Sequence, residues 1–94
     1  METREIKKYL EAHGVPQDQT DELAQKLANT TPVIYGAFTA CVTEGATPDL
    51  CIEGYTCKGL MKELGLSITG ALLTMDWLLR EPEEAKQAIK EGIK

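Results

Sequence analysis

The sequence predicts an all-α fold, a compact bundle of five or six short helices that forms one domain over residues 1–94. Three observations lead to this prediction. Apolar residues recur at three- and four-residue spacing along most of the chain, as they do on one face of a helix. Proline, glycine and hydroxyl residues fall where such helices would begin and end. Aromatic residues make up only 5% of the chain, so the core must depend on aliphatic side chains and methionine, which suits helix packing.

The composition is that of a folded domain with an acidic surface. Hydrophobic residues are 43% and charged residues 27% of the 94 residues, a balance typical of globular chains and not of disordered ones. A chain of this length can form one modest core. The formal net charge of −5 argues against a broad basic face for nucleic acid or for an anionic membrane.

Two amphipathic helices are expected in the N-terminal third. Over residues 3–13, Ile6 and Leu10 are one turn apart, and Gly14 follows at the position where helices often end in a left-handed residue. Over residues 18–28, leucines again recur one turn apart, and acidic side chains gather in the first turns, where the helix dipole favours them.

A third helix is expected to begin at Pro32, with Thr31 as its N-cap. Apolar residues then cover most of the circumference through Val42, which predicts a buried central helix. The alternative is a strand, because Val, Ile, Tyr and Thr favour extended chain, but the cap and the length favour a helix. The following segment, 45–54, contains Pro and two glycines and is expected to be an irregular loop.

Three more helices are expected in the C-terminal half. The first spans residues 56–64 and ends at a tight turn, 65–67. Ser67 then caps a longer helix over residues 68–80. A proline followed by acidic residues marks the start of the last helix, 82–91.

The segment 55–81 resembles the helix-turn-helix and winged-helix superfamily, in which a short helix ends at a glycine, a small residue caps the next helix, and apolar residues join the two helices. The residues that carry the resemblance are Leu60, Met61, Leu64, Gly65, Leu66, Ser67, Ala71, Met75 and Leu78. The resemblance implies a DNA-binding transcriptional regulator whose second helix lies in the major groove. It also implies nucleic-acid contacts at Lys58, Lys62, Ser67, Thr69 and Arg80.

The side chains of the second helix do not suit that role. Its groove-facing positions would include Ile68, Leu72 and Leu73, which offer no hydrogen-bond donor or acceptor for reading bases. The only charged residue from 67 to 79 is Asp76, which phosphates would repel. A helix follows where a winged-helix protein has a β-hairpin, so nucleic-acid binding remains the alternative rather than the first hypothesis.

The same helix is apolar on two sides, which predicts a contact surface. Ala71, Met75 and Leu78 point one way, whereas Leu73 and Trp77 lie on the other side. We therefore expect a protein–protein interaction or oligomerisation module, with a partner or homodimer interface at Leu72, Leu73 and Trp77. The alternative is that the N-terminal helices cover this second side.

The three cysteines offer a third hypothesis. Cys41, Cys51 and Cys57 lack the Cys-x2-Cys spacing of zinc and iron–sulfur sites, so no metal and no cofactor is expected. Cys41 is expected in the core. Cys51 and Cys57 could act as a thiol-based redox or metal-responsive switch, with the Cys57 thiolate favoured by a helix N-terminus, or they could be ordinary thiols.

No pattern marks an enzyme or a membrane protein. The chain has no nucleophile–histidine arrangement and no phosphate-binding glycine loop, so we expect no enzymatic activity. The charged N-terminus predicts no signal peptide, and the longest apolar run, 68–79, is too short to span a bilayer. A cytoplasmic location is therefore expected.

Overall fold

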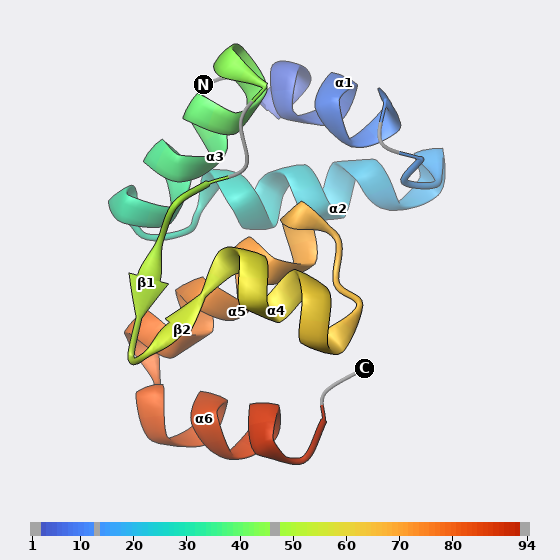
Figure 1. The fold of residues 1–94 in the computed structure, drawn as a ribbon. Helices are drawn as coiled ribbons and strands as arrows, with labels where there is room; N and C mark the ends of the chain where they lie inside the picture. Colours follow the sequence, from blue (N-terminus) through green and yellow to red (C-terminus); the bar gives the residue numbers. More distant parts are fainter. Residues whose placement is uncertain (1–2, 13, 46–47, 93–94) are drawn as a thin grey trace.

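Over the residues that the structure describes, six helices and one small hairpin make up the fold, which confirms the all-α prediction (Figure 1). The structure is a computed structural model, and it describes residues 3–12, 14–45 and 48–92. The elements are α1 (Thr3–Ala12), α2 (Gln17–Ala28), α3 (Pro32–Glu44), β1 (Cys51–Ile52), β2 (Tyr55–Thr56), α4 (Cys57–Leu64), α5 (Ile68–Arg80) and α6 (Pro82–Lys90). Each helix begins within one residue of its expected start, and His13, the last residue expected in the first helix, lies outside the described residues.

The helices form two groups, and α5 is the helix of the lower group that contacts the upper group. In Figure 1, α1, α2 and α3 make the upper part of the molecule, and α4, α5 and α6 make the lower part. Helix α5 contacts α3 above it, α4 beside it and α6 below it, and it also contacts β1. None of the helices in the described ranges is long and apolar enough to cross a membrane.

The turn between α4 and α5 follows the sequence closely. Gly65 has a φ of 67°, which a glycine adopts without the steric cost that a Cβ imposes. The Ser67 hydroxyl accepts a hydrogen bond from the backbone N–H of Gly70 at 3.1 Å, so it caps α5 as expected. The three residues 65–67 therefore connect two adjacent helices.

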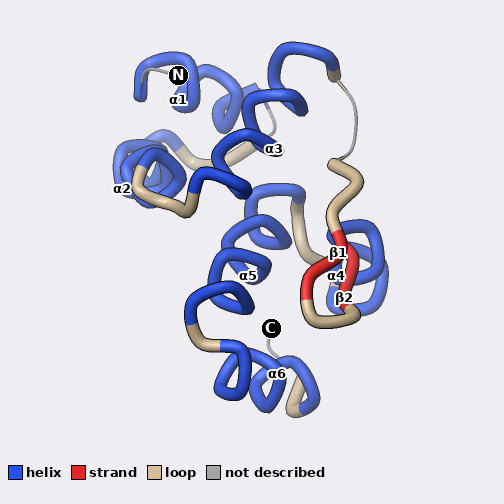
Figure 2. Tube along the Cα trace, turned by 90° about the vertical axis from the view of Figure 1, so that its left-hand side faces the viewer, coloured by secondary structure: helices blue, strands red, loops and turns tan. Residues whose placement is uncertain are grey.

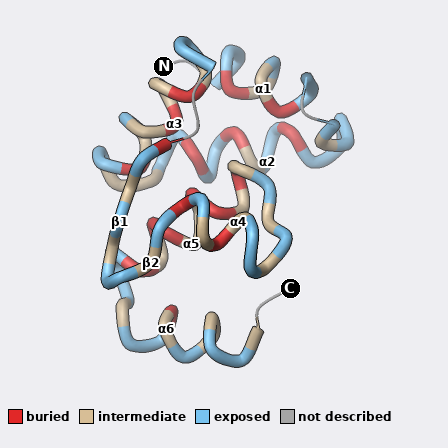
Figure 3. The backbone as a smooth tube through the Cα atoms, in the orientation of Figure 1, coloured by how far each residue is buried: buried red, intermediate tan, exposed pale blue. Residues whose placement is uncertain are grey.

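Helix α5, and not α3, is the central helix. Six of the thirteen α5 residues are buried, including Ala71, Met75 and Leu78, which pack in the main core as expected. In α3 only Ile34, Phe38 and Cys41 are buried, so the expectation that this is the buried central helix is wrong. Figure 3 shows this difference as a buried interior along α5 and exposed segments along α3. Tyr35, Ala37 and Val42 are only partly buried against the core, and Val33 in the first turn is 54% exposed.

The end of the segment expected to be a loop, 45–54, instead forms the first strand and the turn of a β-hairpin whose second strand is β2 (Figure 2). Cys51 pairs with Thr56 and Ile52 with Tyr55 in antiparallel register. The two turn residues, Glu53 and Gly54, both have positive φ, 54° and 85°, which is the backbone of the tightest hairpin turns. The Glu53 carboxylate is 2.9 Å from the Lys86 ammonium, so an ion pair joins the hairpin to α6.

Candidate functional site

A groove of about 650 Å³ lies between α2 and α5. We call it the α2–α5 groove. It is lined by Glu22, Gln25, Lys26, Asn29 and Thr30 from α2 and the residues after it, and by Leu73, Asp76, Trp77 and Arg80 from α5. Two of the three residues expected at a partner interface, Leu73 and Trp77, therefore line one site.

The two walls of the groove have the same spacing, and they differ in their apolar side chains. Positions 22, 25 and 26 of α2 with its C-cap residue 29, and positions 73, 76, 77 and 80 of α5, each follow the i, i+3, i+4, i+7 pattern of one helix face. Each wall is therefore about 10 Å long, at 1.5 Å per residue. The α2 wall carries charged and polar side chains only, whereas the α5 wall presents Leu73 and Trp77 beside the charged Asp76 and Arg80.

Asp76 binds both the start of α3 and the end of α5. The residue is 1% exposed. Its Oδ1 accepts a hydrogen bond from the Thr31 N–H at 2.9 Å, and its Oδ2 is 2.7 Å from Nη2 of Arg80, whose side chain is 65% exposed. A buried carboxylate without partners would be costly, so these contacts account for its position. Thr31 is the N-cap residue of α3 as expected, but its side chain makes no cap hydrogen bond, and its hydroxyl oxygen is buried with no partner among the described residues.

Trp77 is half-buried and held in place. Its indole Nε1 donates a hydrogen bond to Glu81 Oε2 at 3.1 Å. Leu73, one turn earlier, is also half-buried, and both side chains pack against the core. The N-terminal helices therefore cover this side of α5 only in part. The sequence left open whether this side is core or an exposed contact surface, and the structure lies between the two.

Leu72 does not belong to this surface, and its assignment to a partner interface is wrong. The side chain is 0% exposed and lies in the main core. One residue along a helix turns a side chain by about 100°, so Leu72 and Leu73 have different surroundings although they are neighbours in sequence. The contact surface on α5 consists of Leu73 and Trp77 without it.

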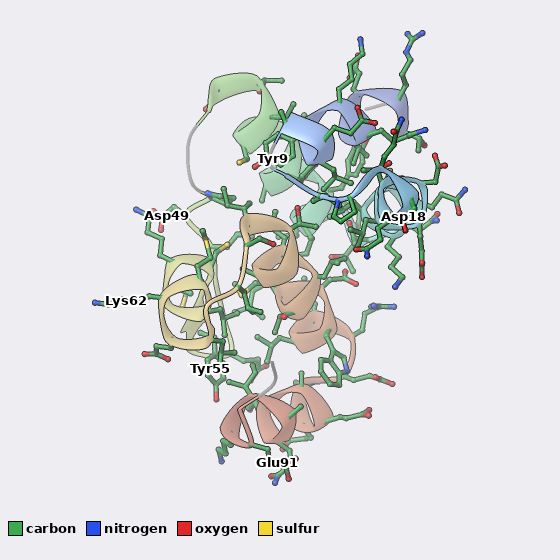
Figure 4. The ribbon with its side chains drawn as sticks, turned by 90° about the vertical axis from the view of Figure 1, so that its right-hand side faces the viewer. Tyr9, Asp18, Asp49, Tyr55, Lys62 and Glu91 are labelled. Carbon is green, nitrogen blue, oxygen red and sulfur yellow. The ribbon has the colours of Figure 1, made fainter. Side chains whose placement is uncertain are left out.

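The residues implied in nucleic-acid contact do not form one surface. Lys58 and Lys62 are exposed on α4, and Ser67 caps the start of α5. Arg80 lies at the other end of this thirteen-residue helix, about 20 Å away at 1.5 Å per residue. Thr69 is only 7% exposed, so the expected contact there is wrong, because its side chain is covered by the fold. Figure 4 shows Lys62 pointing away from the molecule.

Cys51 and Cys57 are both free thiols in very different surroundings. Cys51 is exposed on β1, whereas Cys57, the first residue of α4, is 0% exposed. Burial raises the pKa of the Cys57 thiol, which opposes the stabilisation of its thiolate that a helix N-terminus was expected to give. Cys41 is buried as expected, with its Sγ 3.3 Å from the Tyr9 hydroxyl. The described residues contain no cluster of His, Cys, Asp and Glu that could hold a metal ion.

Thiol labelling should separate the three cysteines. At neutral pH we expect one thiol, that of Cys51, to react rapidly with a chromogenic disulfide reagent, because Cys41 and Cys57 are buried. In denaturant all three thiols should react at the same rate. In the Cys51→Ser variant the rapid phase should disappear. A second rapidly reacting thiol in the folded wild type would contradict the burial of Cys57.

Sequence reasoning missed the α2 wall and the buried carboxylate. No pattern in the sequence distinguishes Gln25 or Asn29 from any other solvent-facing residue of a helix. The pair Asp76 and Arg80 carried a signal, since opposite charges four residues apart share one helix face. That spacing could have indicated that the acid was paired, but not that it was buried.

Comparisons with known proteins add no family. No protein-family model, no curated protein and no solved structure matches this chain. The geometry of the α2–α5 groove is therefore the observation from which we infer a function.

Proposed function

We propose that the chain is a protein–protein interaction module and that the α2–α5 groove is its contact site. The observation that carries the proposal is the position of Leu73 and Trp77, which line the groove as half-buried side chains. Tryptophan is enriched among the residues that dominate binding energy, especially where it is anchored and flanked by polar groups. Here its indole is held by Glu81, and the facing α2 wall is polar.

The proposed partner is a segment of another protein rather than a second copy of this chain. Among the described residues, the exposed large hydrophobic side chains are Val33, 54% exposed, and Leu79, 40% exposed. Obligate dimers cover large, strongly apolar faces, commonly more than about 2,000 Å² in total. A groove with two half-buried apolar anchors suits a short segment that binds and dissociates.

A nucleic-acid function has less support. A recognition helix must present its first turns to the major groove of DNA, but Thr69, Ala71 and Leu72 in the first turns of α5 are buried. The three cations that could contact phosphates are spread over α4 and the far end of α5, and Arg80 already pairs with Asp76. Three dispersed cations attract the DNA phosphates only weakly, because the chain as a whole carries a net charge of −5.

Selection from a phage-displayed library of twelve-residue peptides tests the proposal. The library is selected in parallel on the wild type, on Trp77→Ala and on Val33→Ala, which removes an exposed apolar side chain on another helix. We expect peptides that bind the wild type and Val33→Ala equally and bind Trp77→Ala at least about 30-fold more weakly, the loss typical of a hot-spot residue.

Two outcomes would overturn the proposal. If all selected peptides bind Trp77→Ala as tightly as the wild type, while circular dichroism shows equal helicity, then the groove is not the contact site. If light scattering shows a wild-type dimer that Trp77→Ala converts to a monomer, then the occupant of the groove is a second copy of this chain and not a different protein.

A further inference from the structure

Another pocket, of about 240 Å³, lies between α1 and the start of α5, and we call it the α1–α5 pocket. Its lining residues come from both groups of helices and are Tyr9, Val15, Met61, Ser67, Ile68 and Thr69. In Figure 1 the start of α5 lies below the N-terminal helices. Sites for drug-sized ligands have volumes of about 300–1,000 Å³, so this pocket suits a smaller molecule. It shares no lining residue with the α2–α5 groove.

The first turn of α5 leaves two backbone N–H groups beside this pocket without a protein acceptor. The first N–H groups of a helix have no carbonyl four residues earlier in the same helix. In α5 the Gly70 N–H donates to Ser67 Oγ at 3.1 Å, and the Ala71 N–H donates to the Ser67 carbonyl at 2.9 Å. The N–H groups of Ile68 and Thr69 donate to no acceptor among the described residues. They lie at the positive end of the helix dipole, where an anion is stabilised.

The Thr69 hydroxyl adds a third donor and is a second, independent sign of a ligand. Thr69 is 7% exposed and lines the pocket, so the part that remains exposed faces this space. Its hydroxyl makes no hydrogen bond within the described part of the chain, whereas the Thr74 hydroxyl on the same helix donates to the Gly70 carbonyl at 2.8 Å. A hydroxyl in buried surroundings is unfavourable without a partner, so the partner must be a molecule in the pocket.

The other walls of the pocket are apolar and uncharged. Val15, Met61 and Ile68 supply aliphatic and thioether surface. Tyr9 supplies its ring, and its hydroxyl contacts Cys41 Sγ at 3.3 Å. No carboxylate of the described residues lines the pocket, although the chain as a whole carries −5, so an anion meets no negative side chain at close range there.

We infer that the α1–α5 pocket binds a small aliphatic carboxylate. Both oxygens of a carboxylate accept hydrogen bonds, which matches the three donors of Ile68 and Thr69, and its charge matches the helix dipole. A short alkyl group would cover the apolar walls at Val15 and Met61, which water cannot do favourably. The inference goes beyond the proposed function and is independent of it, because the pocket and the groove have different lining residues.

An NMR titration with isovalerate tests the ligand class. The ¹⁵N-labelled wild-type chain is titrated with isovalerate, acetate and isovaleramide at neutral pH and constant ionic strength. Acetate keeps the carboxylate but lacks the branched alkyl group, and isovaleramide keeps the alkyl group but lacks the charge. We expect isovalerate to shift the amide signals of Ile68 and Thr69 saturably, with a Kd of about 1 mM. Acetate and isovaleramide should each bind at least about 10-fold more weakly.

A pair of variants tests the role of the Thr69 hydroxyl. Thr69→Val keeps the shape of the side chain and removes the hydroxyl, so we expect it to bind isovalerate about 5- to 30-fold more weakly. Its midpoint in urea should not fall, because the lost hydroxyl makes no hydrogen bond within the described chain. Thr74→Val is the matched control. Thr74 does not line the pocket, so this variant should bind isovalerate as the wild type does.

Three results would overturn the inference. If isovalerate causes no saturable shift at Ile68 and Thr69 at concentrations well above the expected Kd, then water alone occupies the pocket. If acetate or isovaleramide binds as tightly as isovalerate, then the ligand class is wrong. If Thr69→Val binds isovalerate as tightly as the wild type, then the assigned site is wrong. None of these results concerns peptides that depend on Trp77, so the proposed function stands or falls separately.

Discussion

Replacing Phe38 with alanine is expected to lower the free energy of unfolding by about 3–5 kcal/mol, the range seen when a buried aromatic side chain is truncated. Phe38 is 0% exposed and is the largest fully buried side chain. Its ring meets the Tyr9 ring edge to face, with centroids 5.0 Å apart and an angle of 86° between the planes. The substitution would remove this aromatic contact between α3 and α1 and leave a cavity beside both helices.

Urea denaturation followed by circular dichroism measures this loss. The midpoint should fall while the slope of the free energy against urea stays constant, as expected when only the native state is destabilised. Val33→Ala is the control, because Val33 lies on the same helix and is 54% exposed; its effect should be about 0.5 kcal/mol or less. A loss below about 1.5 kcal/mol for Phe38→Ala would mean that α3 does not pack as the structure has it.

Replacing Asp76 with alanine is expected to cost about 2–4 kcal/mol, because the Thr31 N–H would lose its acceptor and the ion pair with Arg80 would be lost. Most of the cost should come from the unpaired N–H. The Arg80 side chain is 65% exposed and can return to water, so its unpaired charge adds little.

Two further variants separate these contributions. Asp76→Asn keeps an oxygen that can accept from the Thr31 N–H, so we expect it to lose less stability than Asp76→Ala. Glu63→Ala removes an exposed acid from α4 and should change stability by about 0.5 kcal/mol or less. If Asp76→Ala unfolds at the same urea concentration as Glu63→Ala, then Asp76 does not connect α5 to the start of α3.

Helix ends were the most predictable part of the fold, because short-range chemistry determines them. The Ser67 cap, the left-handed Gly65 and the restart at Pro82 each depend on residues within four positions. The lengths of α4, α5 and α6 follow from these signals almost to the residue. The small hairpin was missed because its turn gives no such local signal. Glu53, one of the two turn residues, is of a type that rarely adopts a positive φ.

The burial of each helix was less predictable, because it depends on packing between distant segments. The sequence of α3 is apolar around most of its circumference, yet only three of its thirteen residues are buried. Helix α5, in contrast, is contacted by three helices and a strand. Leu72 and Leu73 are adjacent and chemically identical, and only the position of α2 and α3 relative to α5 decides that one is core and the other lines a groove. The α2 wall carries no sequence signal, since its residues are ordinary solvent-facing side chains.

The most direct test of the central claim is to locate where a peptide binds the chain. A selected peptide that depends on Trp77 is titrated into the ¹⁵N-labelled wild-type chain, and the amide chemical shifts of all residues are followed. We expect the largest changes in two segments far apart in sequence, residues 22–30 and 73–81, together with the indole N–H of Trp77. Changes centred elsewhere, for example around Tyr9 and Val42 between α1 and α3, would contradict the assignment of the α2–α5 groove as the contact site.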